Sequence, residues 1–416
     1  MKLLFVLENL TARCGPTVGI ALRLAQQLSA RHEISVLTRQ SAQRPIDGEK
    51  AAIFADVTAI GADSTDRLAD YIRRVHWSRM PLWRRLLSLS VHPTMLYRLL
   101  DGKYRLCKAM RRPFQKALEQ LCRAREFDAV VTFCAPYYLA QVLADANVGN
   151  AKKLMLQMDP YTYNYTLPPQ HTEKRRALER YVAGRLDRLL AVSFVADEIK
   201  AREILPATDN LAPFELPGVD PTAHPAAACE PLSADPDRVH FVFTGQFYRG
   251  IRDPHFLLEL FCRLPQQYVL HLVGGGEEQT VDAYRDRLGD RLVTHGWVSS
   301  EEAAALSAAA DVLVNLNNTV SNQLASKLFE YMNTGKPLLN ICKREDCLSL
   351  KYTAKYANCI NVQESEAPEA AAAAVTDFVT ARRGSTVGAE EILAAFFENT
   401  DAHLAKLLER ETEKLL

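Results

Sequence analysis

Short apolar runs alternate with segments of helical periodicity along both halves of the chain, and this alternation constrains the fold most. The pattern is typical of βαβ units and parallel sheets. At 416 residues, the chain is long enough for two domains of ordinary size. The sequence therefore predicts an α/β protein with two similar parallel sheets in succession. The expected strands are residues 3–7, 34–38, 129–133, 153–158 and 188–193, then 239–245, 268–274, 311–316 and 337–341.

A proline-rich segment separates the two sets of expected strands. Residues 211–239 contain six prolines, whose fixed φ and missing amide donor disfavour a continuous element. We therefore predict a first domain over 1–212 with a helical insertion at about 72–126, a linker over 213–238, and a second domain over 239–388. A helical segment over 389–416 follows, and its apolar residues can pack on either domain.

The segment from 72 to 126 is strongly basic, although the chain as a whole is neutral. It carries fourteen Lys and Arg against three Asp and Glu, and Trp77 and Trp83 lie among them. Two interpretations are open: a surface that lies on an anionic membrane and receives a lipid-linked acceptor, or a helical insertion with a solvated basic face. Because no recognition module accompanies this charge, we expect no nucleic-acid partner.

Cysteine usage and the N-terminal sequence bear on the compartment. Nine cysteines are scattered without a CxxC pair or a Cys/His cluster, so the sequence predicts neither a disulfide framework nor a structural metal site. The apolar run at residues 3–7 is too short for a signal peptide, and no run is long enough to span a membrane. We expect a cytoplasmic protein, at most peripheral at the inner face of the cell membrane.

The stretch SKLFEYMNTGKPLL, residues 326–339, combines a helix, a stop and a strand. Lys327 and Glu330 are three residues apart and therefore share one helix face, with Ser326 as the expected N-cap and Gly335 ending the helix. Spacing alone favours an exposed salt bridge. However, a helix that begins at the carboxyl end of a parallel strand is also well placed to bind a phosphate and a hydroxyl group.

Several motifs in order along the chain resemble GT-B glycosyltransferases, particularly the retaining, family 4-like group that includes bacterial cell-surface polysaccharide enzymes. The resemblance is strongest from about residue 180 to 342. It rests on SKLFEYMNTGKPLL, DVLVNLNN (311–318), HGWVSSEEAAALSAAAD (295–311), FTGQFYRG (243–250), LVGGGE (272–277), LPGVD (216–220) and AVS (191–193). It implies two Rossmann-like domains with parallel sheets facing across a cleft, and a C-terminal helix that can return to the N-domain.

The resemblance also implies how a nucleotide-sugar donor would be held. Glu330 matches the position that accepts the ribose hydroxyls, and Lys327, next to Ser326, matches a cation for the diphosphate. Arg249 or Arg252 would supply the second cation, with Arg249 preferred. Because fixed cations and helix amides offset the developing charge, no metal ion or cofactor is expected.

The remaining donor-site candidates lie in loops. Gly15, with Gly19, matches a glycine-rich turn after the first strand. Trp297 and Val298 match the edge that contacts the base through main-chain groups, although Trp297 is equally suited to a core. The glycines expected to allow close approach are Gly245, Gly274 and Gly275, and the loop under the donor sugar includes Ser321, Asn322, Gln323 and Leu324.

Two positions bear on catalysis. Many retaining members carry two glutamates with seven residues between them, and here the first of these positions is Asn322, an amide that cannot supply negative charge. Asp159, in an Asp-Pro-aromatic turn, is a candidate catalytic or acceptor contact, and a turn-capping role is the alternative. The family's N-domain histidine also has no counterpart in Cys134-Ala135-Pro136-Tyr137.

The resemblance therefore predicts a glycosyltransferase that moves a sugar from a nucleotide-sugar donor to a glycan or lipid-linked acceptor, in cell-surface polysaccharide or glycolipid biosynthesis. Two alternatives remain. A non-catalytic GT-B-like partner subunit is favoured by Asn322 and the missing histidine. A nucleotide-sugar epimerase is less favoured, because no histidine or carboxylate set is placed for its acid/base chemistry.

Overall fold

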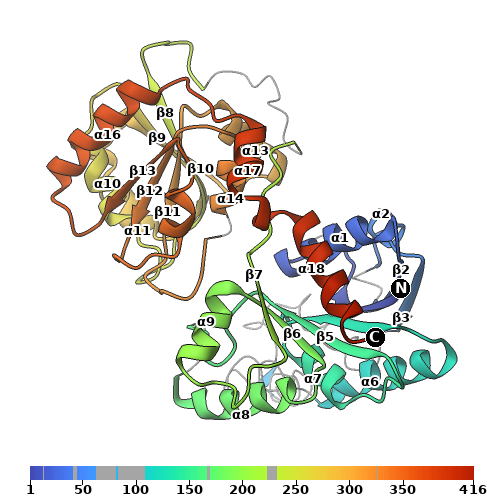
Figure 1. The fold of residues 1–416 in the computed structure, drawn as a ribbon. Coiled ribbons are helices and arrows are strands. Elements are labelled where there is room, and N and C mark those ends of the chain that lie inside the picture. Colours follow the sequence, from blue (N-terminus) through green and yellow to red (C-terminus); the bar gives the residue numbers. More distant parts are fainter. Residues whose placement is uncertain are drawn as a thin grey trace. The chain divides into compact units, whose positions relative to one another are not determined.

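A computed structural model describes residues 1–12, 14–40, 45–61, 81–82, 108–165, 169–222, 232–325 and 327–416. The chain divides into two compact units (Figure 1). Unit 1 comprises Met1–Pro217 together with Asp401–Leu416, and unit 2 comprises Gly218–Thr400. Most of the basic segment at 72–126 lies outside the described residues.

Unit 1 is built on a seven-stranded parallel sheet with the order β3-β2-β1-β4-β5-β6-β7. Successive strands run outward in both directions from β1 and β4, so the sheet is doubly wound with its switch point between these two strands. The strands are β1 (Lys2–Asn9), β2 (Glu33–Arg39), β3 (Asp56–Ile60), β4 (Ala129–Phe133), β5 (Lys152–Gln157), β6 (Arg188–Val192) and β7 (Leu211–Phe214).

The C-terminal helix completes unit 1. Helix α18 (Asp401–Glu413) packs on α1 (Pro16–Ser29), and its buried residues Leu404, Leu407 and Leu408 belong to the core of this unit (Figure 1). At the edge of this contact, Arg23 forms an ion pair with Asp401 and Arg31 forms one with Glu409. The expected return of the C-terminal helix to the first domain is therefore confirmed. The other helices are α2 (Gly48–Ala51), α6 (Lys108–Ala124), α7 (Tyr138–Asp145), η2 (Pro169–His171), α8 (Thr172–Ala183) and α9 (Ser193–Ala201).

Unit 2 contains a second parallel sheet, with six strands in the order β10-β9-β8-β11-β12-β13. The strands are β8 (Val239–Gln246), β9 (Tyr268–Gly275), β10 (Leu292–Gly296), β11 (Val312–Leu316), β12 (Leu338–Cys342) and β13 (Cys359–Gln363). The helices are α10 (His255–Phe261), α11 (Glu278–Asp282), α12 (Arg285–Leu288), η3 (Gly289–Arg291), α13 (Ser300–Ala309), α14 (Lys327–Met332), α15 (Ser349–Thr353), α16 (Pro368–Arg382), α17 (Ala389–Ala395) and η4 (Phe397–Asn399). Two α/β units with parallel sheets confirm the predicted fold class.

All nine expected strands are present, and four described strands were not expected. These four, β3, β7, β10 and β13, are the outer strands of the two sheets. The prolines after residue 211 disfavour a continuous element, yet the short strand β7 lies there and contains Pro213. Proline is tolerated there because an edge strand has one side that needs no ladder hydrogen bond.

Three histidines form a hydrogen-bonded row across neighbouring strands of unit 2. His240 Nδ1 lies 2.9 Å from His271 Nε2, and His271 Nδ1 lies 3.0 Å from His295 Nε2. Burial, followed by the two neighbouring imidazoles, lowers the pKa of His271 from 6.5 to about 4. His271 is therefore neutral near pH 7, and as the central ring it can donate to one neighbour and accept from the other.

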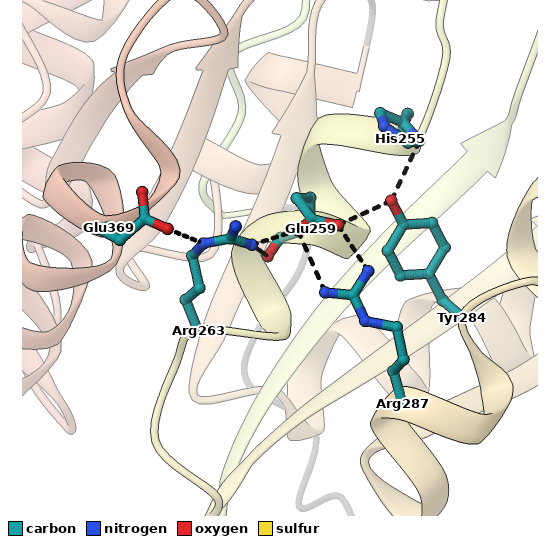
Figure 2. Close-up of polar contacts among 6 residues, drawn as sticks. All are labelled: His255, Glu259, Arg263, Tyr284, Arg287 and Glu369. Atoms are coloured by element: carbon teal, nitrogen blue, oxygen red, sulfur yellow. Dashed lines mark hydrogen bonds and ion pairs between the residues drawn. The ribbon is translucent and has the colours of Figure 1, made fainter.

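A charged cluster links three helices of unit 2 (Figure 2). Arg287 of α12 donates two hydrogen bonds, at 2.8 and 3.2 Å, to the two carboxylate oxygens of Glu259 in α10, a bidentate pair. Glu259 also forms an ion pair with Arg263. Arg263 extends the cluster to Glu369 of α16, and the Tyr284 hydroxyl donates to Glu259 over 2.9 Å. The hydrogen bonds from the two arginines hold the pKa of Glu259 well below its usual range.

Candidate functional site

Helix α14 presents Lys327 and Glu330 on its exposed side and packs with the other. Leu328, Phe329 and Met332 are buried, as the pattern predicted. Lys327 Nζ lies 2.5 Å from Glu330 Oε2, with 40% and 51% of the two side chains exposed. The geometry of this pair alone is that of a surface salt bridge. Ser326, the expected N-cap, lies outside the described residues.

A buried tyrosine fixes α14 to the end of β8. The amide of Thr244 donates to the Tyr331 hydroxyl over 2.9 Å, and this hydroxyl lies 3.2 Å from the Thr244 carbonyl oxygen. Burial raises the pKa of Tyr331 to about 12, so the hydroxyl stays protonated. Sequence reasoning missed both residues. The available signal was a tyrosine on the apolar face of a short helix, where a buried hydroxyl requires a partner.

The Lys327 and Glu330 face borders a cavity of about 1130 Å³ within unit 2. Six predicted donor-site residues contribute to its lining, from the ends of β8, β9 and β10 and from α14: Gly245, Gly274, Trp297, Val298, Lys327 and Glu330. Its volume is sufficient for a cofactor-sized or drug-sized ligand. The structure therefore brings together residues that lie up to 85 positions apart in the sequence.

Close backbone approach at this edge of the sheet requires glycine. Gly274 has φ +122°, and an added Cβ would lie 1.9 Å from the carbonyl oxygen of Gly245 on the neighbouring strand. At Gly275, an added Cβ would lie 2.8 Å from Trp297 Nε1. Glycine is therefore required at both positions by the close packing of neighbouring protein atoms, and Gly245 and Gly274 also line the cavity.

Trp297 is 72% exposed although it is one of the largest side chains of the unit. The alternative that it is a core aromatic is therefore wrong. Ser299 lies two residues after Trp297. Its hydroxyl accepts from the Glu302 amide over 3.1 Å and caps α13. Ser299 also lines the cavity. Sequence reasoning did not single it out, although Ser299 with Glu302 three residues later is a capping-box pattern.

The loops after β8 and β11 are hydrogen-bonded to each other. Arg252 Nε donates to Asn318 Oδ1 over 3.1 Å, and Asn318 Nδ2 donates to Gln323 Oε1 over 3.3 Å. Arg252 and Lys327 both line a second cavity of about 30 Å³. Arg249 is exposed and is not among the described residues that line either cavity. The structure thus groups Arg252, rather than the preferred Arg249, with Lys327.

The three other candidates in the loop after β11 differ in exposure. Ser321 is exposed, Asn322 is half-buried, and Leu324 is buried. Leu324 and its neighbour Ala325 anchor the loop, while Ser321 and Asn322 stay accessible. The loop is therefore packed at its apolar end, at Leu324 and Ala325, and polar at Ser321 and Asn322.

Unit 1 contains Gly15 and Asp159. Gly15 precedes α1 in an extended conformation, and its carbonyl oxygen accepts from the amides of Val18 and Gly19, both at 3.1 Å. An added Cβ at Gly15 would meet nothing within 4 Å. Gly19 lies inside α1, so its interpretation as a turn glycine is wrong. Asp159 is half-buried in the loop after β5, and burial, followed by the charge of Asp159, raises the pKa of Cys134.

Within the described residues, no group of three or more His, Cys, Asp or Glu is arranged to hold a metal ion. Among the helices that the structure describes, none combines the length and apolar character needed to cross a membrane.

Comparison with solved structures identifies the fold. No protein-family model matches the chain, and no curated protein matches it by sequence. Over its full length the chain is similar to the lipopolysaccharide outer core galactosyltransferase WaaB, with 14% identity, a TM-score of 0.59 and 100% of both chains covered. It is also similar to sucrose-phosphate synthase from Thermosynechococcus elongatus (16%, TM-score 0.64, 100% of both chains) and to HepE from Anabaena in complex with UDP and glucose (13%, TM-score 0.60, 100% of both chains). The chain therefore has the GT-B fold, as its sequence predicted.

Proposed function

We propose that this protein is a glycosyltransferase that uses a nucleotide-sugar donor and a glycan or lipid-linked acceptor. The proposal includes retention of anomeric configuration, independence of metal ions, and a role in cell-surface polysaccharide or glycolipid biosynthesis. The observation that carries it is the cavity of unit 2, which Lys327 and Glu330 line together with Gly245 and Gly274 at the strand ends of a GT-B fold. A solved neighbour with this fold holds UDP and glucose, which supports a nucleotide sugar as donor.

Each group at the cavity has a distinct part in the proposed reaction. The Glu330 carboxylate accepts hydrogen bonds from the two ribose hydroxyls, because an ionised carboxylate is a pure acceptor with two oxygens. Lys327 and Arg252 bind the diphosphate, which gains negative charge as the glycosidic bond breaks. Binding therefore exchanges the Lys327–Glu330 ion pair for one contact to the ribose and one to a phosphate. Gly245 and Gly274, which line the same cavity, offer main-chain groups to the ligand.

Thermal unfolding with nucleoside diphosphates tests the proposal. A ligand that binds only the folded state raises the melting temperature by mass action. We expect one of UDP, GDP or ADP to raise it for wild type and for Asp377→Asn, which alters an exposed carboxylate on α16. Glu330→Ala and Lys327→Ala should fold but lose the shift. Absence of a shift with all three nucleotides in the folded wild type would refute the proposed donor site.

A non-catalytic nucleotide-binding subunit is the second candidate. Asn322 favours it, because an amide cannot supply the negative charge that a glutamate would supply to an oxocarbenium-like centre. Nucleotide binding without any sugar released from the matching donor would establish this alternative. Saturable donor hydrolysis, even without acceptor, would exclude it.

Membrane contact belongs to the proposal for the acceptor. The basic segment at 72–126 lies mostly outside the described residues, so its support is the charge pattern of the sequence. Co-sedimentation with vesicles containing anionic phospholipid, which falls as salt is raised, is the expected result. Equal binding to neutral vesicles would remove peripheral membrane contact from the proposal.

A further inference from the structure

A buried carboxylate, that of Glu179 in helix α8, holds the loop that follows β5. Residues 158–165 leave the carboxyl end of the sheet in unit 1 and include Asp159. In helix α8, beneath this loop, Glu179 is only 1% exposed. A buried carboxylate is costly unless hydrogen bonds satisfy it, so its partners indicate what it does.

Three donors converge on Glu179. Gln157 Nε2 donates to Oε1 over 2.8 Å, while the amide of Thr162 donates to Oε2 over 3.2 Å and the Thr162 hydroxyl donates to the same oxygen. From the same helix, Arg175 Nε donates to the Thr162 carbonyl oxygen over 2.9 Å. Thr162 is thus held at its amide, its side chain and its carbonyl group.

Two further contacts restrain the loop near Asp159. Tyr161 stacks on Tyr137 with ring centroids 3.5 Å apart and an interplanar angle of 5°, and the amide of Met158 donates to Cys134 Sγ over 3.3 Å. Asp159 therefore lies between restrained residues on both sides. Its position depends on a scaffold that α8 and the loop after β4 provide.

The location of this loop gives the scaffold a functional meaning. In doubly wound sheets, ligands bind at the carboxyl ends of strands near the switch point. The switch point of unit 1 lies between β1 and β4, and β5 is the neighbour of β4. Unit 2 contains the proposed donor cavity, and among the described residues the corresponding edge of unit 1 is suited to the second substrate.

We infer that Glu179 is a positioning residue for sugar transfer, which anchors the loop after β5 through Thr162 and thereby holds Asp159 in place for the acceptor. This inference rests on the proposed transferase function. Glu179 touches neither substrate. Its effect on the reaction passes through Asp159.

Hydrogen-bond chemistry predicts which substitutions preserve the anchor. In Glu179→Gln, the oxygen of the new side-chain amide can accept from Thr162. Gln157 can turn its own side-chain amide so that Gln157 Oε1 accepts from the new nitrogen. This turn breaks no existing contact of Gln157 Oε1, which has no partner among the described residues. In Glu179→Leu, all three donors lose their acceptor. The anchor should therefore survive the first change and fail in the second. Thr162→Val, which removes only the hydroxyl, gives an intermediate variant if Glu179→Leu folds poorly.

Hydrogen exchange and transfer assays together test the inference. The matched control is Glu173→Leu, because Glu173 lies on the same helix with 78% of its side chain exposed. We expect Glu179→Leu to speed amide exchange in peptides spanning 158–165 by about tenfold or more. Transfer to a panel of 4-nitrophenyl glycosides should fall by about 10- to 100-fold, since small displacements of reacting groups have effects of this order. Glu179→Gln and Glu173→Leu should stay close to wild type.

A double-mutant cycle separates positioning from general stability. If Glu179 acts through Asp159, Glu179→Leu should lower transfer much less in an Asp159→Asn background than in wild type. The KM for the donor and the nucleotide-induced thermal shift should not change, because both belong to unit 2. Unchanged transfer despite a loosened loop, or full additivity in the cycle, would overturn the inference. Failure of the proposed function would instead be visible in the wild type itself, as absence of nucleotide binding or as nucleotide binding without any sugar released from the donor.

Discussion

The Tyr331 hydroxyl lies 2.9 Å from the amide nitrogen of Thr244 and connects helix α14 to the end of strand β8. Tyr331→Phe leaves a buried amide without this partner, which costs about 1–3 kcal/mol in the free energy of unfolding. We also expect a smaller nucleotide-induced thermal shift, because α14 bears Lys327 and Glu330. Tyr248→Phe is the control, since Tyr248 is 45% exposed. Urea titrations that place both variants at wild-type stability would contradict this prediction.

Gly274 and Gly289 both have positive φ but differ in their surroundings. An added Cβ at Gly274 would collide with the Gly245 carbonyl oxygen at 1.9 Å, whereas at Gly289 it would meet nothing within 4 Å. Gly289, with φ 57° and ψ −128°, lies in a region that L residues rarely adopt, so Gly289→Ala should cost about 1–3 kcal/mol. Gly274→Ala should cost about 4 kcal/mol or more, because backbone must also move. Denaturant midpoints of the two variants provide the test, and equal losses would show that the close approach is absent.

The histidine row predicts that the free energy of unfolding falls as the pH is lowered from 6.5 towards 4. The folded pKa of His271, about 4, is below its ordinary value of 6.5, so the unfolded chain binds more protons between these values. The stability contribution is therefore fully present above pH 6.5 and is lost as the pH falls towards 4. Burial also lowers the pKa of His240 and His295, which act in the same direction.

Urea midpoints measured from pH 7 to pH 4 check this expectation. Wild type should lose stability steadily over this interval, and His271→Phe should lose less with acid, although it begins from a lower value. His403, outside this row, offers a matched His→Phe control. Parallel pH profiles for wild type and His271→Phe would rule out His271 as the source.

The cluster in Figure 2 predicts a salt-sensitive contribution to stability. Glu259 has a lowered pKa, so its contribution is present above its ordinary value of 4.5 and is lost as the pH falls further. Glu259→Ala should lower the melting temperature, and the difference from wild type should shrink in high salt. Asp346→Ala removes an exposed pair with Arg344 only two residues away and should have little effect. A difference from wild type that is independent of salt would indicate lost packing instead.

The strands that sequence reasoning could and could not predict differ in their place in the sheet. β4 and β11 are buried at every residue, so they read as continuous apolar runs. All five residues of β3 and four of the five in β13 are half-buried or more exposed, and β7 contains a proline. Edge strands are covered on fewer sides, so their sequences carry a weaker apolar signal. Central strands and the fold class were therefore predictable, and the sheet edges were not.

The candidate site shows a similar division. Lys327, Glu330 and the glycines at β8 and β9 could be found because motif order and spacing fix them. The Arg252–Asn318–Gln323 connection could not, since it depends on how two loops, 66 residues apart, approach each other. Glu179 was also missed, because a glutamate in a helix rich in charged residues gives no sequence signal of burial.

The return of α18 to α1 affects the order in which the two units can be completed during synthesis. Unit 2 is one uninterrupted segment, Gly218–Thr400, whereas unit 1 needs both Met1–Pro217 and Asp401–Leu416. In most multidomain chains, the N-terminal part folds first as it leaves the ribosome. Here the part that is translated first must wait for Leu404, Leu407 and Leu408 to fill its core. Unit 2 can thus be complete while unit 1 still exposes the apolar surface that α18 covers, so the synthesis of Asp401–Leu416 limits when unit 1 can close its core.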